Sequence, residues 1–159
     1  MQKSELVFGY GSNMDPSQMR ERCPESDLAW FIAQAQDRAL FFPRKSIKRK
    51  GGVGSLKVSE GDVVWGVVFS VSGRDLHRLD SFEGVRSDSY TRDPIEVTTQ
   101  DGSRHRVWTY IAVPADNPSK NYTPHKEYIE LYIRGAEYFE LPASYIEKLR
   151  KIKTKNTDK

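Results

Sequence analysis

Short apolar runs, separated by glycine turns and amphipathic stretches, set the pattern of the chain. Residues 6–8 form the first run and predict a short buried strand. Residues 63–69 are apolar at nearly every position, which is typical of a strand buried on both faces, so they predict a central strand. Residues 28–42 end in a further apolar run and predict another strand. The segment 43–61 is rich in Gly, Ser and Lys and is expected to be largely loop, with a short strand at 52–58 left open.

Helix-start signals follow the first and the central strand. Asp15 is a natural N-cap, Pro16 suits the first helical position, and Gln18 stands where a capping box places Glu or Gln. Ser72 likewise caps a helix with leucines one turn apart. Residues 124–139 show helical spacing of apolar positions and predict a third helix.

The C-terminal half adds a hairpin and a last helix. Residues 95–113 alternate around a turn at Asp101-Gly102, which predicts two antiparallel strands. Pro142 opens the last predicted helix. The elements together predict an α+β fold around a largely antiparallel sheet, and closure of that sheet into a barrel is left open by the pattern alone.

Length and composition favour one soluble domain. The chain has 159 residues, which suits one core at 1–150 followed by a basic tail at 151–159 that we expect to be disordered. No apolar run reaches the roughly 18 residues of a membrane helix, and the first residues lack a secretory signal. Cys23 is the single cysteine, which excludes an internal disulfide framework. We expect a cytoplasmic protein with no membrane partner.

Positive charge is concentrated in two places. The formal net charge is +3, but residues 44–50 alone carry five cations, and residues 148–159 carry six cations and one acid. The remainder of the chain is therefore acidic. Neither basic run contains an aromatic residue, so the pattern does not favour a nucleic-acid partner. Solvated surface charge is the plain interpretation of both runs, and an anion site or a weak affinity for polyanions is the alternative.

The turn at residues 9–13 is the first candidate site. Gly9 and Gly11 resemble the start of a dinucleotide fingerprint, but Met14 stands where the third glycine would fall. Tyr10 occupies the place where a serine-hydrolase elbow needs glycine. What remains is a turn whose N–H groups converge near a helix start and attract an anion. A tight strand-to-helix connection without a ligand fits the spacing equally well.

Glu83 is the second candidate. It follows an amphipathic helix, between Phe82 and Gly84, where partial burial would raise its pKa toward a range useful for proton transfer. A solvated glutamate at a helix end is the alternative. The histidines lie far apart without metal-ligand spacing, so no metal site is predicted. The tyrosines either belong to the core or line a pocket, and composition does not choose between these.

Several segments together are similar to one family. The string Phe8-Gly9-Tyr10-Gly11-Ser12-Asn13-Met14 closely resembles the signature turn of the gamma-glutamylcyclotransferase family. Further segments resemble the family in the same order along the chain. They are Val64-Trp65-Gly66-Val67-Val68, Leu79-Asp80-Ser81-Phe82-Glu83-Gly84-Val85, Ser89-Tyr90, and Tyr128 through Gly135-Ala136 to Leu141-Pro142 and Tyr145.

The resemblance implies a small mixed, mostly antiparallel β-barrel flanked by helices. It also implies an enzyme without a metal or organic cofactor, in which the α-amine of a γ-glutamyl group attacks its own γ-amide carbonyl. The products are 5-oxoproline and an amino acid or amine. Glu83 matches the family's catalytic general acid/base. The implied substrate-binding residues are Tyr10, Gly11, Ser12, Asn13, Met14, Tyr90, Tyr110 and Tyr128.

Other readings and departures stay open beside this expectation. A non-catalytic protein that binds γ-glutamyl or other small anionic ligands is one alternative, and polyanion binding through 44–50 and the tail is another. Arg44 is a candidate partner for a substrate carboxylate. Met14 replaces a common leucine, and Glu140 stands where the family often has glycine. Whether the chain forms a homodimer, and which amine leaves, are not determined by the sequence.

Overall fold

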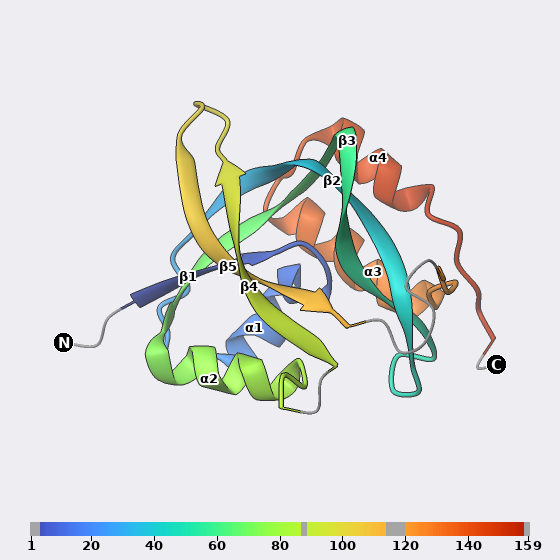
Figure 1. Ribbon diagram of the computed structural model, residues 1–159, viewed down its shortest axis with the longest axis horizontal. Coiled ribbons are helices and arrows are strands. Elements are labelled where there is room, and N and C mark those ends of the chain that lie inside the picture. The colour runs from blue at the N-terminus through green and yellow to red at the C-terminus, as the bar shows by residue number, and fades with distance from the viewer. Residues whose placement is uncertain (1–3, 87–88, 114–119, 158–159) are drawn as a thin grey trace.

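Five strands close into a barrel in the computed structural model, which describes residues 4–86, 89–113 and 120–157 (Figure 1). The strands are β1 (Ser4–Gly9), β2 (Trp30–Ser46), β3 (Gly51–Ser72), β4 (Tyr90–Thr98) and β5 (Arg104–Ala112). Their order around the barrel is β1-β3-β2-β4-β5. The β1–β5 pair is parallel, with Val7 opposite Trp108, and the other pairs are antiparallel. The structure confirms the predicted mixed, mostly antiparallel barrel. It also shows that the sheet is closed, a point that the sequence pattern alone left undecided.

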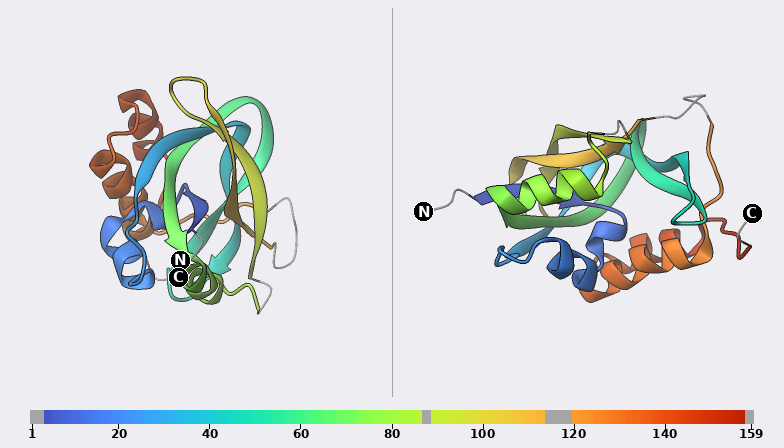
Figure 2. Two further views of the ribbon diagram at one scale, coloured as in Figure 1. Left: turned by 90° about the vertical axis from the view of Figure 1, so that its left-hand side faces the viewer. Right: turned by 90° about the horizontal axis from the view of Figure 1, so that it is seen from below.

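Helices flank the barrel on different sides, as Figure 2 shows. They are the 3-10 turn η1 (Ser12–Met14), α1 (Pro16–Arg22), α2 (Gly73–Phe82), α3 (Lys126–Tyr138) and α4 (Ala143–Arg150). Both predicted N-caps are confirmed, because the Asp15 carboxylate accepts from the N–H of Gln18 at 3.3 Å and the Ser72 hydroxyl accepts from the N–H of Asp75 at 3.1 Å. The buried residues of α2 include Leu76 and Leu79.

The loop predicted over most of 43–61 is wrong, and the short strand left open at 52–58 is part of β3. β2 and β3 form one long antiparallel hairpin that runs through this segment to the pair Ser46–Gly51. The glycines there serve close packing: a Cβ on Gly52 would lie 2.4 Å from the carbonyl oxygen of Tyr122. Ser55 is fully buried, and its hydroxyl accepts from the N–H of Ala112 at 3.0 Å. Local composition indicates a loop at such a site, whereas tertiary contacts make it a strand.

Helix α3 packs closely against the glycine turn. Gly135 of α3 lies against Met14, since a Cβ on this glycine would be 2.4 Å from both the Met14 Cβ and the Met14 carbonyl oxygen. Met14 is completely buried, as is Tyr132 one turn earlier on α3. The helix therefore fixes the turn that follows β1 in place at the end of the barrel.

The basic C-terminal segment contacts the domain. The N–H of Lys155 donates to the carbonyl of Pro124 at 3.0 Å, and the N–H of Lys126 donates to the carbonyl of Lys155 at 2.7 Å. Lys155 thus pairs with the start of α3. The disordered tail expected at 151–159 stays a prediction, and residues 158–159 lie outside the described residues. The domain boundary at 150 stays a prediction.

In the described part of the chain, no helix has the length and apolar character needed to cross a bilayer.

Candidate functional site

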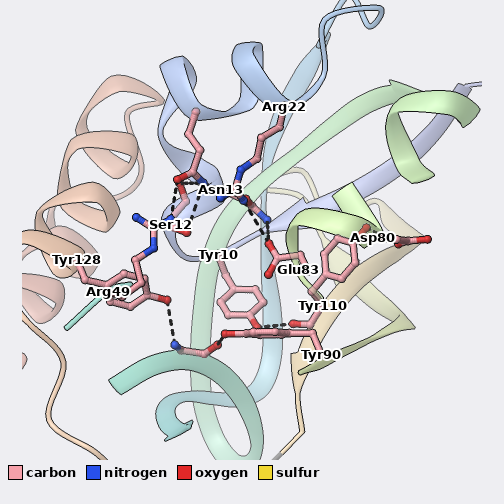
Figure 3. A network of polar contacts seen from close by, with 12 residues as sticks. Tyr10, Ser12, Asn13, Arg22, Arg49, Asp80, Glu83, Tyr90, Tyr110 and Tyr128 are labelled. Atoms are coloured by element: carbon pink, nitrogen blue, oxygen red, sulfur yellow. Dashed lines mark hydrogen bonds and ion pairs between the residues drawn. The ribbon is translucent and has the colours of Figure 1, made fainter. Parts of the chain in front are cut away.

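The turn after β1 and the end of α2 meet at one cavity (Figure 3). Its atoms enclose about 320 Å³ of empty space, part of which opens to solvent. Backbone and side chains from strands, turn and helices line it, most of them aromatic or from the turn. The lining residues are Phe8, Gly9, Tyr10, Gly11, Ser12, Asn13, Gly54, Glu83, Tyr90, Tyr110, Tyr128 and Tyr132.

The end of α2 places Glu83 at this cavity. Glu83 is the C-cap of the helix, and Gly84 follows with φ of 71°, a left-handed conformation that glycine adopts without strain. One turn earlier, Asp80 anchors the helix to the barrel, since its Oδ1 accepts from Tyr110 Oη at 2.7 Å and from Arg92 Nε at 2.8 Å. The catalytic candidate therefore sits on a helix end that is held from two strands.

Glu83 is a partly buried carboxylate with its own partners. Its side chain is 14% exposed, Oε1 accepts from Asn13 Nδ2 at 2.9 Å, and Arg22 Nη1 lies 3.7 Å away. Burial raises the pKa of Glu83, while the Arg22 cation, the Asn13 hydrogen bond and the Arg49 cation lower it in part. The net pKa lies above the ordinary range of a carboxyl, which suits a group that takes up and returns a proton.

A polar chain behind the turn orients Asn13. Its Oδ1 accepts from Gln18 Nε2 and from Arg22 Nη1, each at 3.2 Å, so the amide nitrogen faces Glu83. Gln18 Nε2 also donates to the carbonyl of Ser12 at 3.0 Å, and Gln18 Oε1 accepts from Arg49 Nη2 at 2.9 Å. Gln18 thus holds the turn instead of reaching back to Asp15 as a capping box would.

Three tyrosines are organised around Gly54 of β3. The Gly54 N–H donates to Tyr128 Oη at 3.0 Å, and Tyr90 Oη donates to the Gly54 carbonyl at 3.0 Å. Tyr132 Oη donates to Tyr128 Oη at 3.0 Å. Because the Tyr128 oxygen accepts two hydrogen bonds, its own proton is free to point into the cavity. A Cβ on Gly54 would lie 2.0 Å from Tyr132 Oη, so only glycine fits here.

The tyrosine hydroxyls of the cavity are neutral. Burial raises the pKa values of Tyr10, Tyr90 and Tyr128 above the ordinary value of tyrosine. The pKa of Tyr110 is raised by burial and by its hydrogen bond to Asp80. Tyr10 Oη donates to the carbonyl of Tyr110 at 2.5 Å, which ties the turn to β5. These tyrosines therefore line the cavity as uncharged hydrogen-bond donors, and Glu83 supplies the carboxylate of the lining.

The structure brings together most of the sequence-predicted site residues. Met14 is the exception, because it does not line the cavity and its side chain is buried in the core. Its N–H donates to the carbonyl of Gly11 at 3.0 Å. Arg44 does not line this cavity either, and it donates to the carbonyl of Val113 at 3.0 Å. The residues that line this cavity as predicted are Tyr10, Gly11, Ser12, Asn13, Glu83, Tyr90, Tyr110 and Tyr128.

Sequence reasoning missed several residues of the site: Gln18, Arg22, Arg49, Gly54, Asp80 and Tyr132. Three of these had a local signal. Gln18 and Arg22 lie four residues apart on α1, so both are on the same face of the helix that follows the turn. Tyr132 stands in the same relation to Tyr128 on α3. Arg49 stood in the basic run 44–50, for which an anion site was the alternative, and Gly54 stood in the short strand left open at 52–58, but neither signal pointed to this cavity.

Among residues 4–86, 89–113 and 120–157, no three His, Cys, Asp or Glu side chains gather as a metal site. Cys23 is fully buried, and burial raises the pKa of its thiol to about 12, so it is a poor nucleophile at neutral pH. The chemistry available at the cavity is proton transfer by Glu83, beside a turn whose first N–H groups lack intrahelical partners.

Comparisons with known proteins agree with one another. A model described as the AIG2-like family matches residues 63–149. Gamma-glutamylcyclotransferase of Homo sapiens is 33% identical over 156 residues, which cover 95% of this chain and 80% of the relative. The protein of the same name from Bos taurus is 32% identical, and the alignment covers 94% of this chain and 79% of that protein. A solved structure titled gamma-glutamyl cyclotransferase superposes with a TM-score of 0.88 at 31% identity, covering 98% of this chain and 91% of that one.

Proposed function

Since the chain belongs to the AIG2-like family and is similar to gamma-glutamylcyclotransferases over most of its length, we propose that it is a gamma-glutamylcyclotransferase. The reaction converts a γ-glutamyl compound into 5-oxoproline and a free amino acid or amine. The observation that supports this most directly is Glu83, a partly buried carboxylate with a raised pKa in a cavity formed by the glycine turn.

Ring closure needs no protein nucleophile, because the substrate carries its own. The α-amine of the γ-glutamyl group attacks the γ-carbonyl carbon, and the bond from that carbon to the leaving nitrogen then breaks. The cavity contributes by holding the flexible glutamyl chain in the folded form that brings amine and carbonyl together. Orientation of this kind contributes up to about 7–11 kcal/mol to lowering a barrier.

Glu83 moves the protons that the reaction requires. At neutral pH the attacking group is an ammonium with three protons, the product lactam keeps one, and the leaving amine gains two. The Glu83 carboxylate takes a proton from the ammonium and returns it to the leaving nitrogen, and a second transfer of the same kind completes the balance. Its raised pKa narrows the gap to the ammonium, which makes uptake of the proton less uphill.

Charge on the carbonyl oxygen in the tetrahedral intermediate needs hydrogen-bond donors. The N–H groups at the start of the turn, at Gly11 and Ser12, and the proton of Tyr128 Oη border the cavity and are suited to this role. A single donor of this type is worth about 2.7–4 kcal/mol in other enzymes. A Cβ on Gly11 would lie 3.0 Å from the ring of Tyr132, so any larger residue there would require this ring to shift.

The test is release of 5-oxoproline from γ-glutamyl amino acids and γ-glutamylamines by the wild type, Glu83→Gln and Glu60→Gln. Glu60 is an exposed carboxylate of β3 outside the cavity and serves as the matched control. We expect the wild type and Glu60→Gln to release 5-oxoproline, and Glu83→Gln to lose about 10²–10⁴-fold in kcat. Binding of the panel without any release by the wild type would favour the non-catalytic ligand-binding alternative.

A further inference from the structure

The two basic runs of the sequence lie side by side in the folded chain. A Cβ on Gly51, directly after the β2–β3 turn, would lie 3.1 Å from Cε of Lys155. Three residues earlier, Ile152 lines the same surface cavity as Leu40 of β2. The segment 152–155 therefore runs along the hairpin toward its turn. Figure 1 and the right-hand view of Figure 2 place this segment and the turn at the same end of the molecule.

The β2–β3 turn is an ordered projection that its arginines fix to the domain. Arg44 Nη1 donates to a backbone carbonyl at 3.0 Å, and Arg49 Nη2 donates to Gln18 Oε1 of α1 at 2.9 Å. The turn itself is closed by a hydrogen bond of 3.2 Å from the N–H of Lys50 to the carbonyl of Ile47. The arginines of the first basic run therefore serve internal contacts, and the other residues of the turn are presented outward.

The lysines of both basic runs face solvent at this end. The exposed ones are Lys45, Lys48, Lys50, Lys151 and Lys153. Across residues 4–86, 89–113 and 120–157, no carboxylate forms an ion pair with Lys45, Lys48, Lys151 or Lys153. Ammonium groups gathered on one surface without carboxylate partners create a positive potential that attracts a polyanion.

Ile47 adds an apolar tip to this basic surface. Its side chain is 99% exposed, and the lysines at 45 and 48 flank it. An anionic bilayer suits both features, because an apolar side chain enters the boundary between headgroups and acyl chains while the ammonium groups stay at the lipid phosphates. Nucleic acid suits only the charge, since neither basic run contains an aromatic residue on which a base could stack.

We propose that the β2–β3 turn and residues 151–155 form a surface that binds anionic lipid bilayers, with Ile47 entering the interface. Among the interpretations left open for the two basic runs, this is affinity for a polyanion. The expectation of no membrane partner rested on the lack of a spanning segment and of a secretory signal, and a peripheral contact needs neither. The inference goes beyond the proposed function and does not depend on it.

The test is cosedimentation of the full chain with phosphatidylcholine vesicles that contain either no anionic lipid or about 30% phosphatidylserine. We expect partitioning onto the anionic vesicles to be at least about tenfold stronger, since each lysine at such a surface contributes about fivefold. Raising the salt from about 0.1 to 0.5 M should release the protein, because screening weakens the attraction.

Variants of the turn locate the contact. Lys45→Gln/Lys48→Gln should weaken partitioning by about 25-fold, as two lysines are lost. Its matched control is Lys57→Gln/Arg104→Gln, which removes two exposed cations away from the turn and should keep most of the affinity.

Ile47→Ser should weaken partitioning onto anionic vesicles by about three- to tenfold, because it removes the apolar tip without changing the charge. Val58→Ser is its control, since Val58 is a 77% exposed apolar residue of the same hairpin that pairs with Arg38 away from the turn. Thermal unfolding of all four variants establishes that they are folded.

Equal partitioning onto neutral and anionic vesicles would overturn the inference. So would equal losses in the two double variants, because net charge and not this surface would then govern binding. Tighter binding to duplex DNA than to the anionic vesicles, unaffected by Ile47→Ser, would assign the surface to nucleic acid and likewise overturn the bilayer as its partner.

Discussion

The amide nitrogen of Asn13 donates to Glu83 Oε1 at 2.9 Å and joins two residues that are 70 positions apart in the chain. Asn13 belongs to the turn after β1, and Glu83 ends α2, so this bond couples the turn to the carboxylate that we propose moves the protons. The orientation of the Asn13 amide is fixed by Gln18 and Arg22, which both donate to its oxygen. Asn13 is therefore a positioning residue for Glu83.

Asn13→Ala should raise the pKa of Glu83, because the hydrogen bond from Asn13 stabilises the ionised carboxylate and lowers that pKa. The carboxylate must be ionised to accept the first proton, so the acidic limb of the kcat/KM profile should move to higher pH. We also expect kcat at its optimum to fall by about tenfold, as an unpositioned base is less effective. The measurement is a pH–rate profile of 5-oxoproline release. An unshifted acidic limb would contradict the assignment.

Glu83→Gln should stabilise the folded protein at neutral pH. Burial raises the folded-state pKa above that of the unfolded chain, so the ionised carboxylate costs stability at pH 7, and protonation removes the cost as pH falls through the folded-state pKa. A glutamine does not ionise, so we expect a gain of about 1 kcal/mol at pH 7. The gain should disappear below the unfolded-state pKa. Urea unfolding of the wild type and Glu83→Gln, at pH 7 and in acid, measures the gain in unfolding free energy and its disappearance. A variant less stable at pH 7 would mean that attraction to Arg22 outweighs burial.

Gly54→Ala should damage both stability and activity. The added methyl would lie 2.0 Å from Tyr132 Oη, and the side chain or strand that moves away breaks the bonds that Tyr128 and Tyr90 make to Gly54. We expect a loss of about 1–3 kcal/mol of unfolding free energy, with a lower kcat/KM. Gly73→Ala, at the open start of α2 where a Cβ meets nothing within 4 Å, is the control and should be neutral or slightly stabilising. Thermal unfolding of both variants, together with kinetics, decides the point.

Asp80→Ala should lower kcat more than it changes KM. Asp80 anchors α2 through Tyr110 and Arg92, and its removal leaves two donors without their acceptor while Glu83 loses its support. We expect a cost of about 1–3 kcal/mol in stability. Asp80→Asn keeps one acceptor oxygen and should recover part of kcat. Steady-state kinetics of both variants measure the change in kcat separately from the change in KM. Equal losses in the alanine and asparagine variants would argue against a positioning role.

The element pattern of the fold was predictable wherever the signal was local. The apolar run at 63–69 lies within β3, which pairs with both β1 and β2, and Asp15 and Ser72 cap the helices they were expected to cap. The long hairpin was not predictable, because glycines at 51 and 52 resemble a flexible loop. They are required by the close approach of residues 122–125, which only the folded chain reveals.

The site was predicted in part for a related reason. The turn and Glu83 each stand out as short motifs, and resemblance to a family joined them. The groups that tune Glu83 lie elsewhere: Arg22 ends α1, and Arg49 comes from the hairpin turn. Met14 lies inside the motif, but its side chain belongs to the core, and its part in substrate binding stays a prediction.

The sequence by itself determined the order of strands and helices, the capped turn after β1 and the presence of a carboxylate at the end of α2. Those features depend on neighbours within a few residues, where apolar spacing and capping chemistry act directly. Only the tertiary structure decided that Asn13 faces Glu83, that Gly54 organises the tyrosines and that a basic hairpin borders the same carboxylate. These contacts, and the burial that raises the pKa of Glu83, arise when the barrel closes and brings distant segments out of water together.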